Sequence, residues 1–404
     1  MENQKLKPYR KDDKWGVCDE NKSIIVECIY DDVVTFEKGS VLVYQNEKVG
    51  LINSKGEKLT QCVYDELFHF KEGLARVIQN NKSGFINEQG ELVIPCEYYE
   101  AREFNHGLAP AMKNRLWGFI NSQGENVIPF IYDTVQDFEA EYAGVQNEYK
   151  WGIINKKGEQ IVPCVYGAIF YHSDDFIIAE QNKKWGFINT NAEQVIPFIY
   201  DRLYYFSEGL APAQQNNKVG FINNKGEQVI PFEYDEATFF NDGIARVTQN
   251  EKSGFINSKG EEVIPCIYNE ISDFNEGLAV VANTDWIYGF ISKKGEQVVP
   301  FIYDVAFNFV GGVARVKKGE KWGFINSAGE ELFPLIYDSV SDFSDGLARV
   351  NLDGKWGFVN MKGEQVIPFH YDDSYPFNEG LALVEQDGNW LGYIDVKGNK
   401  YWEN

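Results

Sequence analysis

Carboxylates are the most frequent candidates for chemistry in this sequence, which contains 61 Asp and Glu among 404 residues. Paired carboxylates can act as general acid and base. However, an Asp recurs directly after a recurring Tyr, and a Glu recurs after a turn glycine, as in Glu227 and Glu364. A residue repeated in most copies of a pattern is more economically a turn or cap residue than a catalyst. The Asp residues in question are Asp133, Asp201, Asp235, Asp304, Asp338 and Asp372.

Histidine and cysteine do not form a metal-ligand pattern. His69, His106, His172 and His370 have no ligand spacing to another His or Cys. Five cysteines occupy a position that holds Phe in other copies, as at Phe369, so we interpret it as an apolar packing position with reduced thiols. Disulfides or metal binding between neighbouring copies are the alternative. The five are Cys28, Cys62, Cys96, Cys164 and Cys266.

No motif of a known enzyme class is present. The sequence lacks a Gly-x-Ser-x-Gly elbow, a Walker loop, a dinucleotide fingerprint and a calcium loop. We therefore expect a protein that is not an enzyme and has no metal and no cofactor. The one region where an active site would be sought is around His172, which replaces a recurring aromatic residue.

Lys beside Trp gives the strongest candidates for binding. Lys precedes the Trp position in nine of twelve copies. These charges are either a solvated edge that discourages strand aggregation or part of a stripe that contacts an elongated partner, because recognition surfaces are enriched in aromatic residues. The predicted binding residues are Trp117, Trp151, Trp185, Trp322, Trp356, Lys150, Lys184, Lys321 and Lys355.

These residues belong to a tandem repeat that accounts for nearly the whole chain. A glycine after the Trp position returns every 34 residues, and the step lengthens to 35 twice. A fixed period of this length is the signature of a repeat architecture. The twelve glycines are Gly16, Gly50, Gly84, Gly118, Gly152, Gly186, Gly220, Gly254, Gly289, Gly323, Gly357 and Gly392.

Each repeat reads as an antiparallel meander. Alternating strands are predicted at residues 347–350, 355–360 and 364–369, separated by turns whose glycines favour positive φ. Asn360 can bond the backbone two residues on, which explains its recurrence without a ligand. The proline after the recurring Ile ends regular pairing. Before them lies a connector, 337–343, which we interpret as a bulged strand or one helical turn.

The ends and the middle of the array depart from the pattern. We interpret residues 1–30 as a partial N-terminal capping repeat, residues 31–371 as ten tandem repeats, and residues 372–404 as a C-terminal capping repeat. Residues 139–176 are irregular, because Glu141 and Asp175 replace turn glycines and His172 replaces a Phe. This irregularity is either neutral drift or a bend or contact site.

The recurring Lys-Trp-Gly-Phe-Ile-Asn, Gly-Glu, Val-Ile-Pro, Tyr-Asp and Phe-x-x-Gly-Leu-Ala segments resemble the WG (KWG) repeat family of bacterial proteins. The resemblance covers residues 6–402. It implies a bacterial β-repeat protein with a binding or scaffold role, and it brings no catalytic residues. The Trp position departs from the family pattern, since it holds Val49, Ser83 and Leu391 in some copies.

The predicted fold class is all-β: twelve 34-residue antiparallel meander repeats that form an open superhelix or solenoid. Twelve units exceed the 4 to 8 blades of typical propellers, about 34 residues is short for a four-stranded blade, and both ends resemble caps. One or two β-propellers are the alternative, with the irregular segment as the junction of two six-bladed ones.

Composition limits the partners. A net charge of -23 repels phosphate backbones, so nucleic acid is not expected. No apolar run is long enough for a membrane helix, and the first seven residues do not resemble a signal peptide. We expect a cytoplasmic scaffold that binds a protein or peptide, although a mature secreted form stays open. A carbohydrate-binding repeat protein is the alternative, because 23 Tyr and 9 Trp supply stacking platforms.

Overall fold

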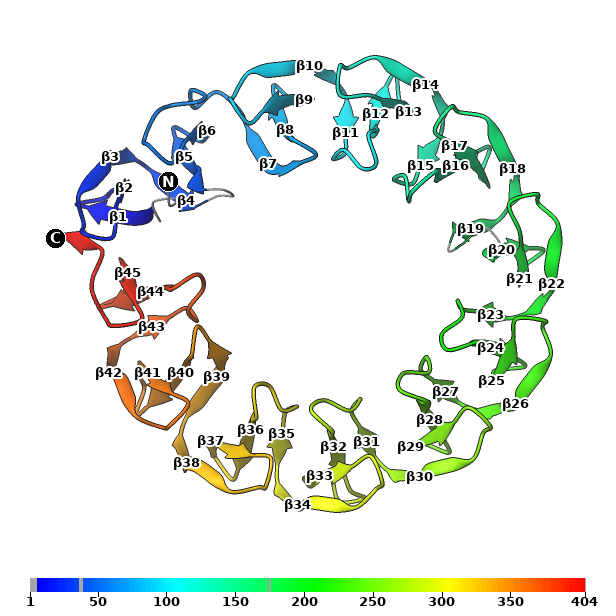
Figure 1. The fold of residues 1–404 in the computed structure, drawn as a ribbon. Coiled ribbons are helices and arrows are strands. Elements are labelled where there is room, and N and C mark those ends of the chain that lie inside the picture. Colours follow the sequence, from blue (N-terminus) through cyan, green and yellow to red (C-terminus); the bar gives the residue numbers. More distant parts are fainter. Residues whose placement is uncertain (1–5, 36–38, 172, 174–175, 404) are drawn as a thin grey trace. The chain divides into compact units, whose positions relative to one another are not determined.

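The computed structural model describes residues 6–35, 39–171, 173 and 176–403. Every regular element in these ranges is a β-strand (Figure 1), which confirms the all-β prediction. The strands form ten four-stranded sheets and two three-stranded sheets, one for each repeat. The predicted positions His172 and Asp175 lie outside the described residues.

One sheet illustrates the repeat. It contains β15 (Thr134–Val135), β16 (Tyr142–Asn147), β17 (Lys150–Asn155) and β18 (Gln160–Tyr166), which pair antiparallel in chain order. The connector is therefore a short fourth strand. In β7 (Glu66–Lys71) it is longer and has a register shift between Leu67 and Phe70, so the bulged-strand interpretation is correct and the helical turn is not.

The hairpin between the last two strands has the predicted turn chemistry. The Asn360 Oδ1 accepts hydrogen bonds from the backbone N–H groups of Lys362 (2.9 Å) and Glu364 (3.0 Å), and Gly363 has a φ of 77°. Glycine is favoured here because a Cβ is strained in the left-handed region. Polar turn chemistry thus fixes the hairpin without a ligand.

Successive sheets pack face to face through apolar side chains. Phe119 of β13 (Leu116–Ile120) and Ile128 of β14 (Asn126–Tyr132) share one core cluster with Val145 and Ile154 of the following sheet. Phe138, at the predicted core Phe position, is 1% exposed and lies edge-on to Phe119, with ring centroids 4.8 Å apart. Such T-shaped pairs add to the stability gained from burial. The predicted contact between neighbouring copies is confirmed.

The predicted open superhelix is wrong, and the ends of the chain show why. The first sheet has the order β3 (Ile24–Tyr30), β2 (Lys14–Cys18), β1 (Lys7–Lys11) and β46 (Trp402–Glu403), so the last strand completes the first sheet. The two ends of the chain therefore meet in one sheet, with three strands from the N-terminal segment and one from the C-terminal segment, which is how β-propellers close. Each sheet is thus a propeller blade, and the propeller alternative applies, with twelve blades.

A 34-residue repeat can hold four strands because the first of them is often only two residues long, as in β15. Two separate six-bladed propellers would need the strand that completes the first sheet to come from mid-chain, whereas β46 comes from the end. The irregular segment keeps the usual order: β19 (Ala168–Tyr171), β20 (Ile177–Gln181), β21 (Lys184–Ile188) and β22 (Gln194–Tyr200) form one blade.

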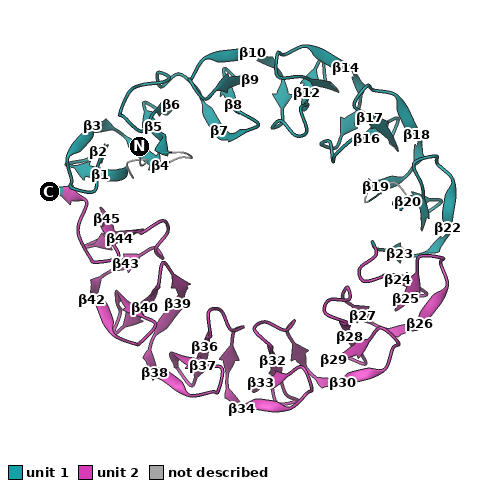
Figure 2. Cartoon of the chain, in the orientation of Figure 1, with its two compact units in different colours: residues 1–205, 403–404 teal, residues 206–402 magenta. Residues whose placement is uncertain are grey.

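The blades divide into two compact units (Figure 2). Unit 1 comprises residues 1–205 and 403–404, and unit 2 comprises residues 206–402. The repeated contacts described above for unit 1 recur in unit 2, where Phe221 and Phe240 form an equivalent ring pair at 4.8 Å.

Candidate functional site

The recurring Lys and Asp residues form contacts between blades. The Lys321 ammonium lies 2.5 Å from Asp338 Oδ1, and Asp338 Oδ2 accepts the backbone N–H of Asp353 in the next blade at 2.9 Å. The hydrogen bond from Lys321 lowers the pKa of Asp338 and raises the pKa of Lys321. The corresponding pairs are Lys14–Asp31, Lys48–Asp65, Lys184–Asp201, Lys218–Asp235 and Lys355–Asp372.

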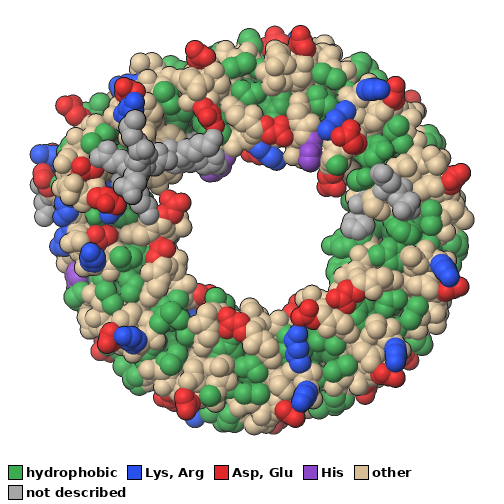
Figure 3. All heavy atoms as spheres, viewed as in Figure 1, with side chains coloured by type: hydrophobic (Ala, Val, Ile, Leu, Met, Phe, Trp, Pro, Cys, Tyr) green, Lys and Arg blue, Asp and Glu red, His purple; other side chains and the backbone are tan. Residues whose placement is uncertain are grey.

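This contact explains why the Asp recurs, since one carboxylate holds a lysine of its own blade and a turn of the following blade. The prediction that it is a structural turn residue is confirmed. Figure 3 shows basic side chains beside acidic ones at several points on the visible face. The predicted binding residues Lys184, Lys321 and Lys355 are therefore engaged in ion pairs, although their side chains are 40 to 48% exposed.

Lys150 is the exception among the predicted lysines. The position of its Asp partner is occupied by Gly167, and Lys150 has no ion pair with any residue that the structure describes. A Cβ at residue 167 would collide with the Glu180 carboxylate, which accepts the backbone N–H of Lys183. Glu180 thus takes over the turn contact that Asp makes in other blades and leaves Lys150 without a carboxylate.

The predicted tryptophans lie on the blade face that packs against the next repeat. Trp117 is 4% exposed, and the Arg102 guanidinium lies over its ring at 4.6 Å. The Arg349 guanidinium covers Trp356 in the same way at 3.7 Å. Trp151, Trp185, Trp322 and Trp356 are half-buried. Trp117, Trp151, Trp322 and Trp356 pack in clusters that include residues of the following blade, whereas Trp185 stacks on Phe170 of its own blade.

A more exposed apolar surface lies on the last strand of each blade, which forms one edge of its sheet. In β14 the side chains of Val127, Pro129 and Ile131 are exposed, while Ile128 and Tyr132 are buried. The same pattern of burial recurs in β22, β26 (Gln228–Tyr234) and β34 (Gln297–Tyr303), although Glu233 takes the place of the exposed Ile in β26. We call the exposed residues of these strands the edge-strand surface.

The edge-strand surface was not predicted from the sequence. The Val, Pro and Ile positions were treated as part of the last strand of the meander, and which of these side chains are exposed was not considered. The signal was present: in six copies apolar residues occupy every second position of this strand in addition to the buried positions, which exceeds what one buried face needs. Proline lacks the N–H that an added strand would need. The surface therefore resists strand addition and offers side chains for contact.

The cysteines pack as the sequence predicts, although less deeply. Cys18 is buried, Cys28, Cys62, Cys96, Cys164 and Cys266 are half-buried, and all six are free thiols. Burial raises the pKa of the Cys164 thiol, which contacts the Val145 carbonyl oxygen at 3.8 Å.

Within the described ranges no group of three or more His, Cys, Asp or Glu is arranged to hold a metal ion. The described part of the chain contains no helix that is long and apolar enough to cross a membrane.

Comparison with known protein families tests the resemblance of the repeat to the WG repeat family. Eleven successive segments match the family model described as WG containing repeat: 15–48, 50–82, 84–117, 117–151, 151–185, 185–218, 220–252, 254–284, 288–322, 322–356 and 356–390. The chain belongs to the WG containing repeat family. The WG segments run from one Trp position to the next, so each one joins the end of one blade to the start of another.

Solved structures resemble this WG repeat protein only distantly. A eukaryotic initiation factor has 11% identity, and the match covers 74% of this chain and 95% of that one at a TM-score of 0.37. BamB from Moraxella catarrhalis has 9% identity, with coverage of 78% and 94% and a TM-score of 0.24. Hsv2p from Kluyveromyces lactis has 10% identity, with coverage of 55% and 92% and a TM-score of 0.28. No curated protein matches the chain.

Proposed function

We propose that this WG repeat protein is a non-enzymatic scaffold that binds another protein through its edge-strand surface. The observation that carries the proposal is the exposed Val-x-Pro-x-Ile pattern, present in the same position of several blades. Ile131 is 51% exposed and Ile199 is 44% exposed. Recurrent exposed apolar side chains at fixed spacing mark an interaction surface, and affinity would come from several weak contacts in series.

The charge of the chain indicates the chemistry of the partner. With a net charge of -23, long-range attraction favours a partner whose surface carries Lys and Arg around an apolar centre. The predicted residues Trp151, Trp185 and Trp322, together with Lys150, lie at the solvent edge of the blade faces and belong to the proposed surface as its rim. The other predicted residues support the blades: Trp117 is buried, Arg349 covers Trp356, and Lys184, Lys321 and Lys355 are held in ion pairs.

A charge placed on the edge strand tests the proposal. A variant with Ile131→Lys and Ile199→Lys is compared with a control that carries Asn126→Lys and Gln194→Lys on the same two strands, where the native residues are exposed and polar. Both variants change the net charge equally. Quantitative affinity capture from the source cells should recover the wild-type partner with the control but at least about tenfold less with the test variant. Equal recovery would count against the edge-strand surface.

A glycan is the second candidate ligand, because one group of aromatic rings in unit 1 is open to solvent. Phe170 is 53% exposed and stacks on Trp185, with centroids 6.0 Å apart and planes 18° from parallel. Tyr204 and Tyr205 are 40% and 47% exposed at the corresponding positions of the next repeat. Flat aromatic faces of this kind can stack on sugar rings.

Glycan arrays distinguish this candidate from the scaffold. The wild type is compared with Phe170→Ala and with Tyr149→Ala, which removes a ring that is 87% exposed in a turn. Binding that disappears only with Phe170→Ala would favour a glycan site. An absence of signal from the wild type would remove the candidate and leave the scaffold proposal as it stands.

A further inference from the structure

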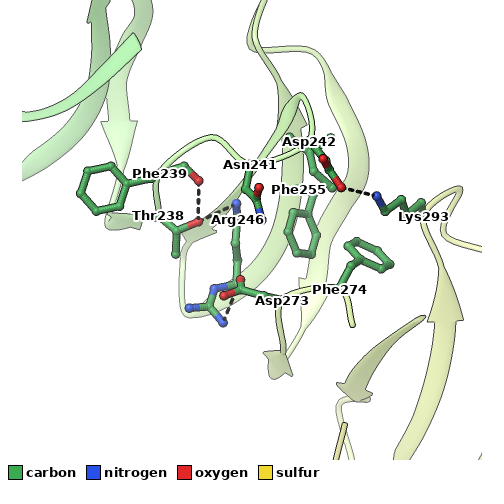
Figure 4. A pocket seen from close by; sticks show the side chains of 10 residues that line it. Thr238, Phe239, Asn241, Asp242, Arg246, Phe255, Asp273, Phe274 and Lys293 are labelled. Carbon is green, nitrogen blue, oxygen red and sulfur yellow. Dashed lines mark hydrogen bonds and ion pairs between the residues drawn. The ribbon is translucent and has the colours of Figure 1, made fainter. Parts of the chain in front are cut away.

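A small cavity lies between two blades of unit 2 (Figure 4). One blade contains β27 (Glu236–Ala237), β28 (Ile244–Gln249), β29 (Lys252–Asn257) and β30 (Glu262–Tyr268). The next contains β31 (Glu270–Ile271), β32 (Leu278–Ala282), β33 (Tyr288–Ser292) and β34. The cavity volume is about 310 Å³, at the small end of the range for ligand pockets.

The cavity opens where one repeated contact is replaced. In other blades a turn carboxylate accepts the backbone N–H of the equivalent turn glycine in the next blade. Glu208 does so with Gly243 at 2.9 Å, and Glu276 does so with Gly312 at 2.8 Å. Asp242 occupies this turn position but pairs with Lys293 at 3.0 Å instead. The turn of this blade is therefore tied to a hairpin and not to the turn beside it.

The aromatic pair between these two blades is correspondingly less covered. Phe240 and Phe309, at the core Phe position of other repeats, are each 1% exposed, whereas Phe274 is only half-buried. Phe274 lies against Phe255, with ring centroids 5.1 Å apart, and both line the cavity. The inner surface thus offers two aromatic rings to an apolar group.

Charged groups of both signs flank these rings. On one side Lys293 pairs with Asp242, and on the other Arg246 lies 3.9 Å from Asp273, as Figure 4 shows. The Arg246 Nη1 also donates a hydrogen bond to the Ile271 carbonyl oxygen at 2.8 Å, which holds the guanidinium in place. Two cations and two carboxylates cancel, so the lining is neutral in a chain whose net charge is -23.

A neutral lining that carries ion pairs disfavours a ligand with a single net charge and suits a ligand that carries both a positive and a negative group. We infer that this cavity binds a free α-amino acid with an apolar side chain. The carboxylate would face Arg246 and the ammonium group would face Asp273 on one side of the rings. The side chain would lie on the two Phe rings, and the pair of Lys293 with Asp242 would bound the cavity on the other side. This inference rests on the cavity alone and is independent of the edge-strand surface.

Calorimetric titration with L-phenylalanine and L-leucine tests the inference. Phenethylamine, which lacks the carboxylate, and 3-phenylpropionate, which lacks the ammonium group, serve as matched probes. We expect the wild type to bind at least one of the amino acids, and to bind both probes at least about tenfold more weakly, because each probe leaves one charged side chain of the lining without a ligand group opposite it. No heat from either amino acid up to millimolar concentration, or equal affinity for the probes, would overturn the inference.

Two variants locate the site. Lys293→Met and Asp273→Asn each remove one charge, and both side chains are substantially exposed, so the fold should be retained. The control is Lys156→Met, at the same hairpin position in another blade, where Lys156 pairs with Glu141 at 2.9 Å. We expect about tenfold weaker binding for the first two variants, and binding equal to wild type for the control. Unchanged binding by both Lys293→Met and Asp273→Asn, with melting temperatures equal to wild type, would exclude this cavity.

Discussion

The Tyr9 hydroxyl donates a hydrogen bond to Glu403 Oε1 at 3.0 Å, and Lys11 pairs with Glu403 Oε2 at 3.2 Å. Burial and the hydrogen bond to Glu403 raise the pKa of Tyr9 to about 12. Both contacts lower the pKa of Glu403 below its ordinary value of 4.5. One side chain near the end of the sequence therefore fastens β46 to β1.

Removal of residues 402–404 should destabilise the first blade, because β1 then becomes an unpaired edge strand. We expect faster hydrogen exchange at the backbone amides of residues 7–11 and a lower melting temperature. Glu403→Gln keeps the strand and removes only the charge, so its effect should be smaller. Unchanged exchange in the truncated protein would contradict the role of β46.

The contact at Glu403 should also depend on pH. Since the folded pKa of Glu403 is lowered, the ionised form stabilises the blade above pH 4.5, and this contribution is lost as the pH falls through the lower folded value. Hydrogen exchange of β1 should accelerate in this acidic range in the wild type. The acceleration should be weaker in Glu403→Gln, where no carboxylate titrates.

Asp338→Asn should lower the melting temperature of unit 2 more than Asp304→Asn does. Asp338 pairs with Lys321 and also accepts the backbone N–H of Asp353 in a turn. Asp304 accepts the equivalent turn N–H, that of Gly319, but has no lysine partner among the described residues, because Ile287 occupies the position that corresponds to Lys321. Because the pair is exposed, the difference should shrink at high salt. Thermal unfolding at low and high salt measures it, and an equal effect of the two substitutions would show that the lysine contributes nothing.

The same pair should weaken in acid. The pKa of Asp338 lies below its ordinary value of 3.8, so its ionised form stabilises above pH 3.8 and the stabilisation disappears as the pH falls through the folded pKa.

Phe138→Ala should destabilise unit 1 by about 3 to 5 kcal/mol, because it empties a buried position between two blades. Phe170→Ala removes the same ring from an exposed position and should cost much less. Chemical denaturation monitored by circular dichroism compares them. Similar losses for both variants would show that the Phe138 position does not carry the packing between blades.

Ala192→Gly should stabilise the protein by about 1 kcal/mol, because Ala192 has a φ of 60° at a hairpin position where other repeats have glycine. Gly260→Ala makes the opposite change at the same position, where φ is 81° and the added Cβ would meet Ile230 at an ordinary 3.4 Å. It should destabilise by a similar amount. Melting temperatures that move in the same direction would refute the backbone explanation.

Gly167→Asp should restore the usual pair with Lys150 only if Glu180 is changed as well. Alone it places a Cβ against the Glu180 carboxylate and should destabilise the blade. With Glu180→Ala the space is free, and the double variant should be more stable than the Gly167→Asp single variant. A double-mutant cycle measures this coupling, and simple additivity would contradict the proposed exchange of roles.

The sequence alone determined the features that each repeat contains within itself. The 34-residue period, the strands and the hairpin chemistry of Asn360 and Gly363 depend on contacts a few residues apart, so a single copy is enough to predict them. The core Phe position was also predictable, because its side chain is aromatic in nearly every copy, and ring pairs like that of Phe138 with Phe119 recur at several junctions.

Only the tertiary structure decided how the copies are joined and which side chains remain free. The contact of Glu403 with Tyr9 was not predictable, because it joins residues 394 positions apart and no single repeat encodes it. The capture of Lys321 by Asp338 and the exposure of Ile131 were hidden for a related reason. Whether a side chain meets solvent or a neighbouring blade depends on the packing between blades, which the alternation along one strand does not specify.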